Sequence, residues 1–388
     1  MIHIYHNSNI SHSTKEKVNK ACEAQFKDLP DFVDDYLKNT DSTSELIQKF
    51  FQNKQYTSMV WCGTGGSFLS AQIISDILGP QSSKKIFFLE NLDAYKVETT
   101  LSHIDKDKTL FVFASKSGRT ADVLILKNLI EKRITKLSEQ SLVLTQSSSS
   151  PLRTWAEEHN SYIIELPENI CGRFSCFTAI GLLALNFYEP NQLKSWKRGA
   201  QWALDHKNIT AELCEFYLQS LYDEKWISVF WIYSSIFKKW GDWAQQLWAE
   251  SLAKNTDGAK RVSTPIAALG SLDQHSLLQQ FSDGYPDKSY SFFTFNYPKE
   301  INKNLQVTGL GVEFAEVLKV QGQSTYAALE GQPKIMLEVD FQDIAALSAL
   351  FMSYQMVVCV MADLLNVYPF DQPGVEKSKS IARTKLGF

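Results

Sequence analysis

The fold is decided by the stretch "TLFVFASKSGRTADVLILKNLIEKR", residues 109–133. An apolar run is followed by a polar turn and then by apolar residues at helical spacing, which predicts a strand, a turn and a helix. The turn at 115–120 carries three hydroxyl side chains and two cations. Open parallel sheets bind anions where a strand leads into the N–H groups of a helix, so we expect a phosphate here.

The same alternation continues on both sides of this stretch. Four further apolar runs separated by helix signals lie at 56–62, 84–91, 141–146 and 161–167. Ser150 before Pro151 is a good helix start. Five apolar runs joined by helices predict a parallel sheet covered on both faces.

A helical stretch at about 176–223 follows, and then the alternation restarts. Its apolar runs are "KWISVFWIYSS" (225–235), "SYSFFTFNY" (289–297) and "KIMLEVD" (334–340). The fold class we expect is therefore α/β, with two doubly wound parallel-sheet domains and helices on both faces. We expect an N-terminal helical segment at 1–55, a first domain at 56–200 and a second at 201–388 that ends in a C-terminal helix.

Composition narrows the possible partners. A hydrophobic share of 44% indicates a globular chain, and a net charge of −4 gives no reason to expect nucleic acid. The six cysteines are scattered, as in a reduced cytoplasmic protein, and the N-terminus shows no secretory signal. Polar residues interrupt the apolar stretch 346–365, so we expect a buried helix there and no membrane contact.

A second glycine-rich turn, "CGTGGSF" (62–68), follows the first apolar run. Gly66 would let the backbone approach a phosphate closely, and Ser67 would cap the next helix and donate to an oxygen. One alternative is that Ser67 and Thr120 are only helix caps, each worth about 1 kcal/mol. Another is a dinucleotide fingerprint, which the sequence disfavours because the third glycine would fall at Phe68.

The segment "WAQQLWAESLAK" (243–254) has helical spacing and two polar residues on one face. Gln246 and Glu250 are four residues apart, and Lys254 continues the same face. The plain alternative is an exposed Glu250–Lys254 pair worth a few tenths of a kcal/mol. Tryptophan and leucine residues make the rest of the helix apolar, and a partly desolvated carboxylate would suit a general base.

Three further segments contain residues that can move protons or stabilise charge. His275 enters a helix in "GSLDQHSLLQQF", where Asp273, Gln274 and Ser276 would orient its ring, although a histidine there is often structural. Arg173 precedes an apolar helix, either as an ion-pair partner or as a stabiliser of an oxyanion.

The C-terminal segment "FDQPGVEKSKSIARTK" (370–385) places Glu376 and Lys379 three residues apart on one helix. Charges at such spacing are usually solvated. Taken alone, each of these signals is weak.

Six of these segments, taken in order, resemble the phosphoglucose isomerase family. They are "GTGGS", "SKSGRT", "CGRFS", "QQLWAES", "DQHS" and "DQPGVEKSK", and they extend from about residue 60 to 380. The first two also resemble the wider sugar-isomerase (SIS) domain, so the last four carry the specificity. The resemblance implies reversible conversion of glucose 6-phosphate to fructose 6-phosphate, a step of glycolysis and gluconeogenesis.

The resemblance also implies roles for single residues. Gly66 would allow close backbone approach to the phosphate, which would be contacted by Ser67, Ser115, Lys116, Ser117 and Thr120. Gln246 and Gln372 would position the sugar. Proton transfer and ring opening would involve Glu250 as the base, Arg173 as stabiliser of the enediolate, and His275 with Lys379. No metal or organic cofactor is implied, and the enzymes of the family are homodimers that borrow the histidine, here His275, from the neighbouring subunit.

Two departures from the family pattern keep alternatives open. Arg119 lies where the family often has a small or hydroxyl residue, and Cys171 lies beside Gly172 where a second glycine is common. The "SGRT" form raises the alternative of a bifunctional isomerase that also accepts mannose 6-phosphate. A non-catalytic sugar-phosphate-binding protein built on the same domain is the third possibility.

Overall fold

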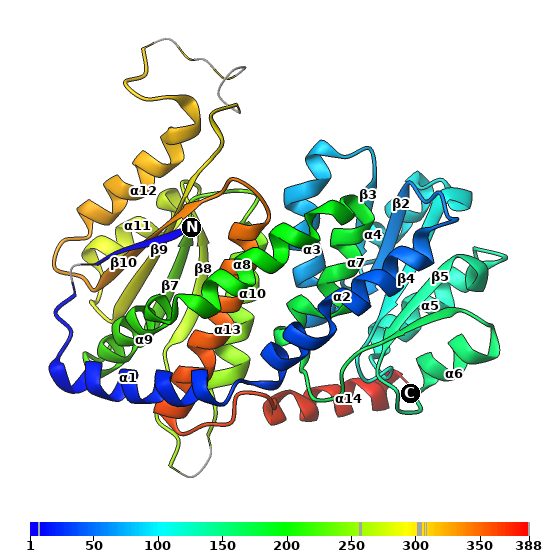
Figure 1. Ribbon diagram of the computed structural model, residues 1–388, viewed down its shortest axis with the longest axis horizontal. Helices are drawn as coiled ribbons and strands as arrows, with labels where there is room; N and C mark the ends of the chain where they lie inside the picture. The colour runs from blue at the N-terminus through cyan, green and yellow to red at the C-terminus, as the bar shows by residue number, and fades with distance from the viewer. Residues whose placement is uncertain (7, 256–257, 301–304, 306, 308, 387–388) are drawn as a thin grey trace. The chain divides into compact units, whose positions relative to one another are not determined.

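The computed structural model describes the whole chain except residues 7, 256–257, 301–304, 306, 308 and 387–388. The chain forms two compact units, neither of them continuous in sequence (Figure 1). Unit 1 comprises Met1–Leu29 and Lys194–Pro369, and unit 2 comprises Pro30–Leu193 and Phe370–Phe388. The chain therefore crosses between the units three times.

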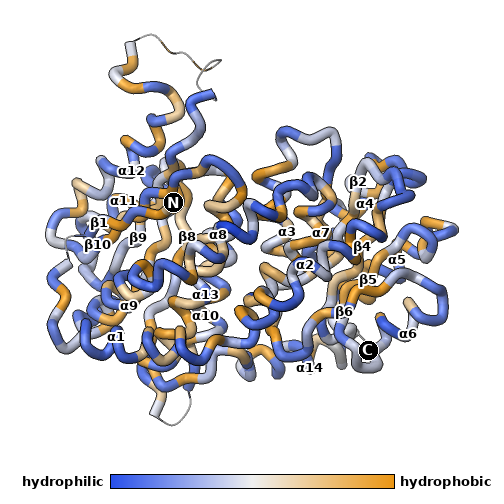
Figure 2. The backbone as a smooth tube through the Cα atoms, in the orientation of Figure 1, coloured by the Kyte–Doolittle hydropathy of each residue, from blue (hydrophilic) through white to orange (hydrophobic). Residues whose placement is uncertain are grey.

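Unit 2 contains a five-stranded parallel sheet of order β3-β2-β4-β5-β6. Its strands are β2 (Ser58–Gly63), β3 (Lys85–Leu89), β4 (Thr109–Ala114), β5 (Ser141–Thr145) and β6 (Tyr162–Glu165). Every residue of β2, β4 and β5 is buried, as sequence runs of that kind predict, and Figure 2 shows β4 and β5 in hydrophobic colours. All five predicted strands of this half are confirmed.

Helices cover both faces of the unit 2 sheet. The helices are α2 (Asp31–Phe51), α3 (Leu69–Leu78), α4 (Ala94–His103), α5 (Ala121–Glu131), α6 (Pro151–Glu158), α7 (Ala179–Tyr188) and α14 (Glu376–Leu386). One face packs on α4, α5 and α6 through a cluster that includes Phe111, Phe113 and Trp155. Helices α3 and α7 pack together, as do α2 and α7. The predicted start of α6 is confirmed, because the Ser150 side chain accepts from Arg153 N with Pro151 in the first turn.

Unit 1 contains a five-stranded sheet of order β1-β10-β9-β7-β8. Its strands are β1 (Ile2–His6), β7 (Ile227–Ile232), β8 (Thr264–Leu269), β9 (Lys288–Asn296) and β10 (Lys334–Asp340). The pairs are parallel except that β1 runs antiparallel to β10. The second predicted sheet is thus present, with one antiparallel edge strand.

Alternate residues of β7, an interior strand between β9 and β8, face the two helical layers of unit 1. Its helices are α1 (His12–Lys27), α8 (Leu193–Asp205), α9 (Lys207–Tyr222), α10 (Lys238–Leu252), α11 (Gln274–Asp283), α12 (Val317–Ala328) and α13 (Ala345–Leu365). Trp231 packs in a cluster with residues of α11, whereas Phe230 contacts aromatic rings of α9, α10 and α13. This alternation is what the twofold period of a strand requires.

Helix α13 is long and apolar enough to cross a membrane by length and composition alone. Its 18-residue apolar window is fully buried within the structure. The buried helix predicted from the interrupted apolar stretch is therefore present.

The division of the chain differs from the linear one that we predicted. The expected N-terminal segment at 1–55 divides between the units: β1 adds to the sheet of unit 1, whereas α2 belongs to unit 2. The C-terminal helix α14, expected in the second domain, also belongs to unit 2. The physical reason is that tertiary pairing, which a local pattern does not encode, decides where each terminus packs.

Candidate active site

The glycine-rich turn lies between β2 and α3 and forms a short 3-10 turn at Gly65–Ser67. Ser67 N donates to Thr64 O at 3.1 Å, and Trp61 Nε1 donates to Ser67 O at 2.9 Å, so the backbone of the turn is held from both sides. The cap position of α3 is Phe68, and no side chain makes a capping bond there. The predicted capping role of Ser67 is therefore wrong, because the 3-10 turn places this residue before the cap position.

The second turn, 115–120, joins β4 to α5. Ser115 Oγ and Thr120 Oγ1 share a hydrogen bond of 2.7 Å, and Ser115 N donates to Leu144 O at 3.0 Å. Thr120 occupies the cap position of α5, but its side chain makes no capping bond. The plain alternative that these hydroxyls only cap helices thus finds no support at either turn.

Gly118 makes this second turn possible. Its φ is +60°, a conformation that residues with a Cβ rarely adopt. A Cβ atom at this position would also lie 2.0 Å from Ser150 Oγ. The turn is therefore packed directly against the segment that starts α6.

The two cations of the second turn are both tethered. Lys116 Nζ donates to Glu168 O at 2.7 Å. Burial lowers the pKa of Lys116, against an opposing effect of nearby Cys171 and Glu168. Arg119 Nη2 donates to Ser149 O at 2.9 Å, and Arg119 N donates to Ser117 Oγ at 3.3 Å. The unusual Arg119 thus braces the turn, while Ser117 lies exposed.

Arg173 is the most buried charged residue among the predicted site residues, with 1% of its surface exposed. It lies in the turn Gly172–Phe177, which leads into α7. Its Nη1 donates to Gln372 Oε1 at 2.7 Å and its Nη2 donates to Asp371 O at 2.9 Å. A buried guanidinium needs such partners, and here they come from residues about 200 positions later in the chain.

The turns that contain Gly66 and Arg173 touch backbone to backbone. A Cβ atom on Gly66 would lie 2.1 Å from the carbonyl carbon of Gly172 and 2.5 Å from Arg173 N. Only glycine fits at such a distance. Unit 2 therefore brings together the first phosphate turn, Arg173 and Gln372.

Lys379 lies on α14 and pairs with Glu376 at 2.8 Å, with both side chains well exposed. The expected solvated pair is confirmed. Lys379 follows Gln372 by only a few residues. Because Arg173 donates to Gln372, Arg173 anchors the segment that leads to Lys379.

Glu250 and Gln246 lie on α10 in unit 1, and both are half-buried. Gln246 Nε2 donates to Glu250 Oε1 at 3.1 Å, as their four-residue spacing predicts. Lys254 Nζ donates to the backbone carbonyl of Glu250 at 2.8 Å. Helix α10 thus places the Gln246 amide against the Glu250 carboxylate. Lys254 lies just after the C-terminal end of the helix.

His275 lies exposed in the first turn of α11. The neighbours expected to orient its ring bond elsewhere. Asp273 accepts from Leu269 N at 2.7 Å and from Ser276 Oγ at 2.9 Å, and Gln274 Nε2 donates to Tyr233 Oη at 2.9 Å. The orienting role predicted for them is wrong, because Asp273 and Ser276 bond within the start of the helix and Gln274 bonds to Tyr233 and Thr325.

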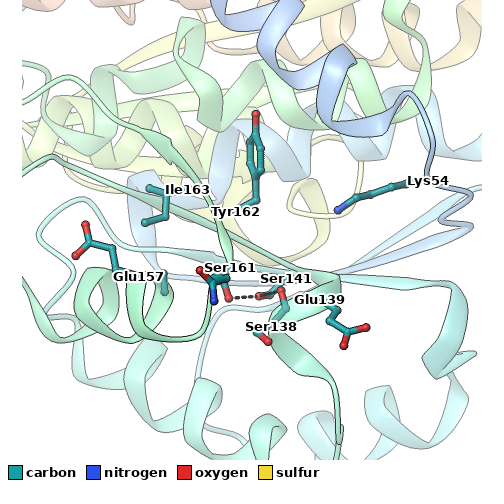
Figure 3. Close-up of a pocket in the computed structure, with 10 residues that line it drawn as sticks. Lys54, Ser138, Glu139, Ser141, Glu157, Ser161, Tyr162 and Ile163 are labelled. Carbon is teal, nitrogen blue, oxygen red and sulfur yellow. Dashed lines mark hydrogen bonds between the residues drawn. The ribbon is translucent and has the colours of Figure 1, made fainter.

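A hollow of about 620 Å³ lies in unit 2 away from these turns (Figure 3). It is lined by residues at the amino ends of β5 and β6, where Ser141 Oγ and Ser161 Oγ share a hydrogen bond of 2.9 Å. Lys54 reaches over it from the end of α2. The phosphate turns follow the carboxyl ends of the strands, so this hollow is not part of the predicted site.

The sequence reasoning missed two groups that shape the site. The backbone carbonyl of Asp371 holds Arg173, and a carbonyl has no side-chain signature that a sequence pattern reveals. Ser175 lies inside the quoted segment "CGRFS", but its side chain had no assigned role.

The Phosphoglucose isomerase family model matches residues 6–284. The glucose-6-phosphate isomerase of Methanocaldococcus jannaschii is 31% identical over 87% of this chain and 86% of its own length. That of Campylobacter jejuni is 31% identical over 90% of this chain and 91% of its own.

A solved structure shows the same fold. The glucose-6-phosphate isomerase of Chlamydia trachomatis superposes with a TM-score of 0.78 at 20% identity, covering 89% of this chain and 73% of that one. The family match covers well over half of the chain and contains the phosphate turns, Arg173, Glu250 and His275. The chain belongs to the phosphoglucose isomerase family.

Proposed function

We propose that this chain is a glucose-6-phosphate isomerase, which interconverts glucose 6-phosphate and fructose 6-phosphate through ring opening and a cis-enediol. The observation that carries the proposal is the buried Arg173, held by Gln372 in the same unit as two hydroxyl-rich turns. Family membership and relatives that bear this name support the reaction.

The phosphate of the sugar would bind at the turns of unit 2. Ser67, Ser115, Ser117 and Thr120 supply hydroxyls, and Lys116 supplies positive charge. The phosphate does not react, so its role is to supply binding energy that holds the sugar carbons in place. The tethered backbone of both turns means that little ordering is required when the phosphate binds.

Glu250 would carry the proton during isomerisation. Its carboxylate removes the C2 proton of the open-chain sugar and returns it to C1, while the hydroxyl proton of O2 passes to O1 and the double bond shifts through the enediol. Gln246 holds one carboxylate oxygen, which fixes the orientation of the base. The Arg173 guanidinium would stabilise the negative charge that develops on the sugar oxygens, an effect that is large in a site with preorganised donors.

Ring opening would require an acid and a base at the ring oxygen and its hydroxyl, for which we propose His275 and Lys379. His275 is exposed, which fits a residue that completes the site of a second subunit. We therefore propose a homodimer in which His275 crosses the interface. We also propose a cytoplasmic location, because none of the six cysteines, all of which are described in the structure, forms a disulfide.

A coupled assay of fructose 6-phosphate conversion in the presence of a chelator tests the reaction. The expected result is full activity with the chelator, because the scheme uses only side chains. Absence of conversion in either direction would overturn the proposal. Mannose 6-phosphate in the same assay separates the bifunctional alternative, which requires turnover of this sugar as well.

Mixing two inactive variants tests the shared site. Glu250→Gln and His275→Ala chains, unfolded and refolded together, would form mixed dimers with one intact site each. Random pairing would then restore about a quarter of the wild-type activity. If the mixture stays inactive while each variant alone forms dimers, His275 does not act across the interface.

A further inference from the structure

Ser175 is a buried serine whose hydroxyl contacts two separate turns. It lies in the turn Gly172–Phe177 and is 6% exposed. Its Oγ donates to Gly172 O at 2.6 Å and to Gly66 O at 3.2 Å. A hydroxyl has one proton, so it is shared between the two carbonyls, with the shorter bond to Gly172.

The two carbonyls belong to the peptide groups that precede the proposed site residues. The carbonyl of Gly66 belongs to the peptide that leads to Ser67, and the carbonyl of Gly172 to the peptide that leads to Arg173. The orientation of each peptide plane fixes the position of the next Cα atom. One hydroxyl therefore sets both the phosphate-binding serine and the arginine.

The backbone around this hydroxyl leaves little freedom for either turn. Gly66 and Gly172 are in direct contact, and Arg173 is anchored at its far end by Gln372 and Asp371. The two turns come from segments about a hundred residues apart in sequence. The Ser175 bond to Gly66 O is a direct polar link between these turns, beside the packing of the two glycines.

We propose that Ser175 is a positioning residue that sets the distance between the bound phosphate and the Arg173 guanidinium. The proposal rests on the proposed function, because it assigns these two groups to the same substrate molecule. Ser175 itself does not touch the substrate. A misplacement of about 1 Å between binding and reacting groups is sufficient to cost about 10²-fold in rate.

The plain alternative is that Ser175 only supports the start of α7. Thr178 offers a matched control, since it is a buried hydroxyl three residues later with 5% exposure. Its Oγ1 donates to Ser175 O at 2.8 Å and accepts from Ile180 N at 3.3 Å, which makes it the cap of α7. Thr178→Val removes the cap and leaves the contacts of the Ser175 hydroxyl in place.

The test measures kcat, KM and the inhibition constant of inorganic phosphate for Ser175→Ala, Thr178→Val and the wild type. Ser175→Ala is expected to lower kcat about 10- to 100-fold while phosphate inhibition changes less than about twofold. Thr178→Val is expected to keep kcat within about twofold and to lower Tm by about 2–4 °C. An unchanged kcat in Ser175→Ala, an equal kinetic loss in both variants, or a parallel loss of phosphate affinity would each overturn the proposal.

Amide hydrogen exchange of the same variants tests whether Ser175 links the two turns, and this measurement needs no activity assay. Peptides covering 64–69 and 171–176 are expected to exchange faster in Ser175→Ala than in Thr178→Val, and both peptides are expected to change together. If neither peptide changes, Ser175 does not link the turns. If both peptides exchange faster in Ser175→Ala as expected but the wild type does not isomerise sugars, the proposed function is rejected. The link between the two turns is then still established.

Discussion

The proposed phosphate-binding turns of unit 2 and the proposed proton-transfer residues of unit 1 are built differently. In unit 2, Ser115 and Thr120 bond to each other, Lys116 bonds to a backbone carbonyl, and the buried Arg173 donates to Gln372 and Asp371. In unit 1, the Glu250 carboxylate accepts a hydrogen bond from the Gln246 side chain on the same helix, and His275 lies exposed at a helix start.

The difference follows from what each group has to do. A phosphate that does not react is best bound by donors fixed in advance, since ordering them on binding would cost free energy. A residue that carries a proton has to exchange partners during the cycle, so it gains little from a permanent network. If this contrast is correct, substitutions in the two regions affect different kinetic constants.

The largest effect is expected for Glu250→Gln. The amide keeps the shape of the side chain but cannot accept the C2 proton, so kcat should fall at least about 10²-fold while phosphosugar binding stays near normal. Steady-state kinetics and a binding measurement check this. Lys254→Met is the matched control and should keep kcat within about twofold; an equal loss there would favour the plain Glu250–Lys254 pair.

Arg173→Met is expected to have the next largest effect. It removes the charge that stabilises the enediolate and leaves Gln372 Oε1 and Asp371 O without this donor. We expect a fall of about 10²-fold in kcat and faster proteolysis near 371–376, measured by kinetics and by limited digestion with mass analysis. Arg153→Met, which removes an arginine of the same unit that pairs with Glu157 and Glu165, should change neither.

Thr120→Val is expected to weaken the binding of phosphate and of the phosphosugar. It removes one hydroxyl from the Ser115–Thr120 pair, so KM and the phosphate inhibition constant should rise together by about tenfold with a smaller change in kcat. Ser70→Ala is the control, because the buried Ser70 hydroxyl has no partner within the described residues. A kcat effect as large as that of Glu250→Gln would break the contrast between the regions.

The smallest effect is expected for Asp340, which lies on β10 beside the edge strand β1 of the unit 1 sheet. Burial alone would raise the pKa of Asp340, but hydrogen bonds from Asn296 and His3 lower it. The folded state therefore prefers the charged carboxylate, so its stabilising contribution is present above about pH 4 and is lost as the pH falls further.

Asp340→Asn should accordingly flatten the loss of stability in acid. The difference should be about 1 kcal/mol or less, because the side chain is 36% exposed. Urea unfolding between pH 3 and pH 6 measures it, with isomerase activity at neutral pH as the control, which should not change. A steeper loss in the variant would contradict the assigned direction.

Local sequence predicted most of the sheets because their strands are long apolar runs. The strands that escaped prediction are unusual. In β8, "TPIAAL" contains a proline and two alanines, which suits an edge strand, and β1 reads "IHIYH" with two histidines at the other edge. Edge strands are buried on one side only, so they give a weaker hydrophobic signal.

The site was predictable to the extent that its residues belong to motifs. The order of the six segments identified Arg173, Gln246, Glu250 and Gln372 as candidates. The hydrogen bond between Arg173 and Gln372 was not predictable, because spacing along the chain says nothing about contacts between residues 199 positions apart. Nor could spacing reveal that the Ser115 and Thr120 hydroxyls bond to each other.

The threading of the chain has a consequence for its synthesis. Gln372 and Asp371, which hold the arginine, are added by the ribosome about 200 residues after it. Until they leave the exit tunnel, Arg173 lacks these acceptors, although the sheet around it has long been complete in sequence. A nascent chain is therefore expected to carry a folded unit 2 sheet with an unfinished charge centre until residues 371 and 372 emerge.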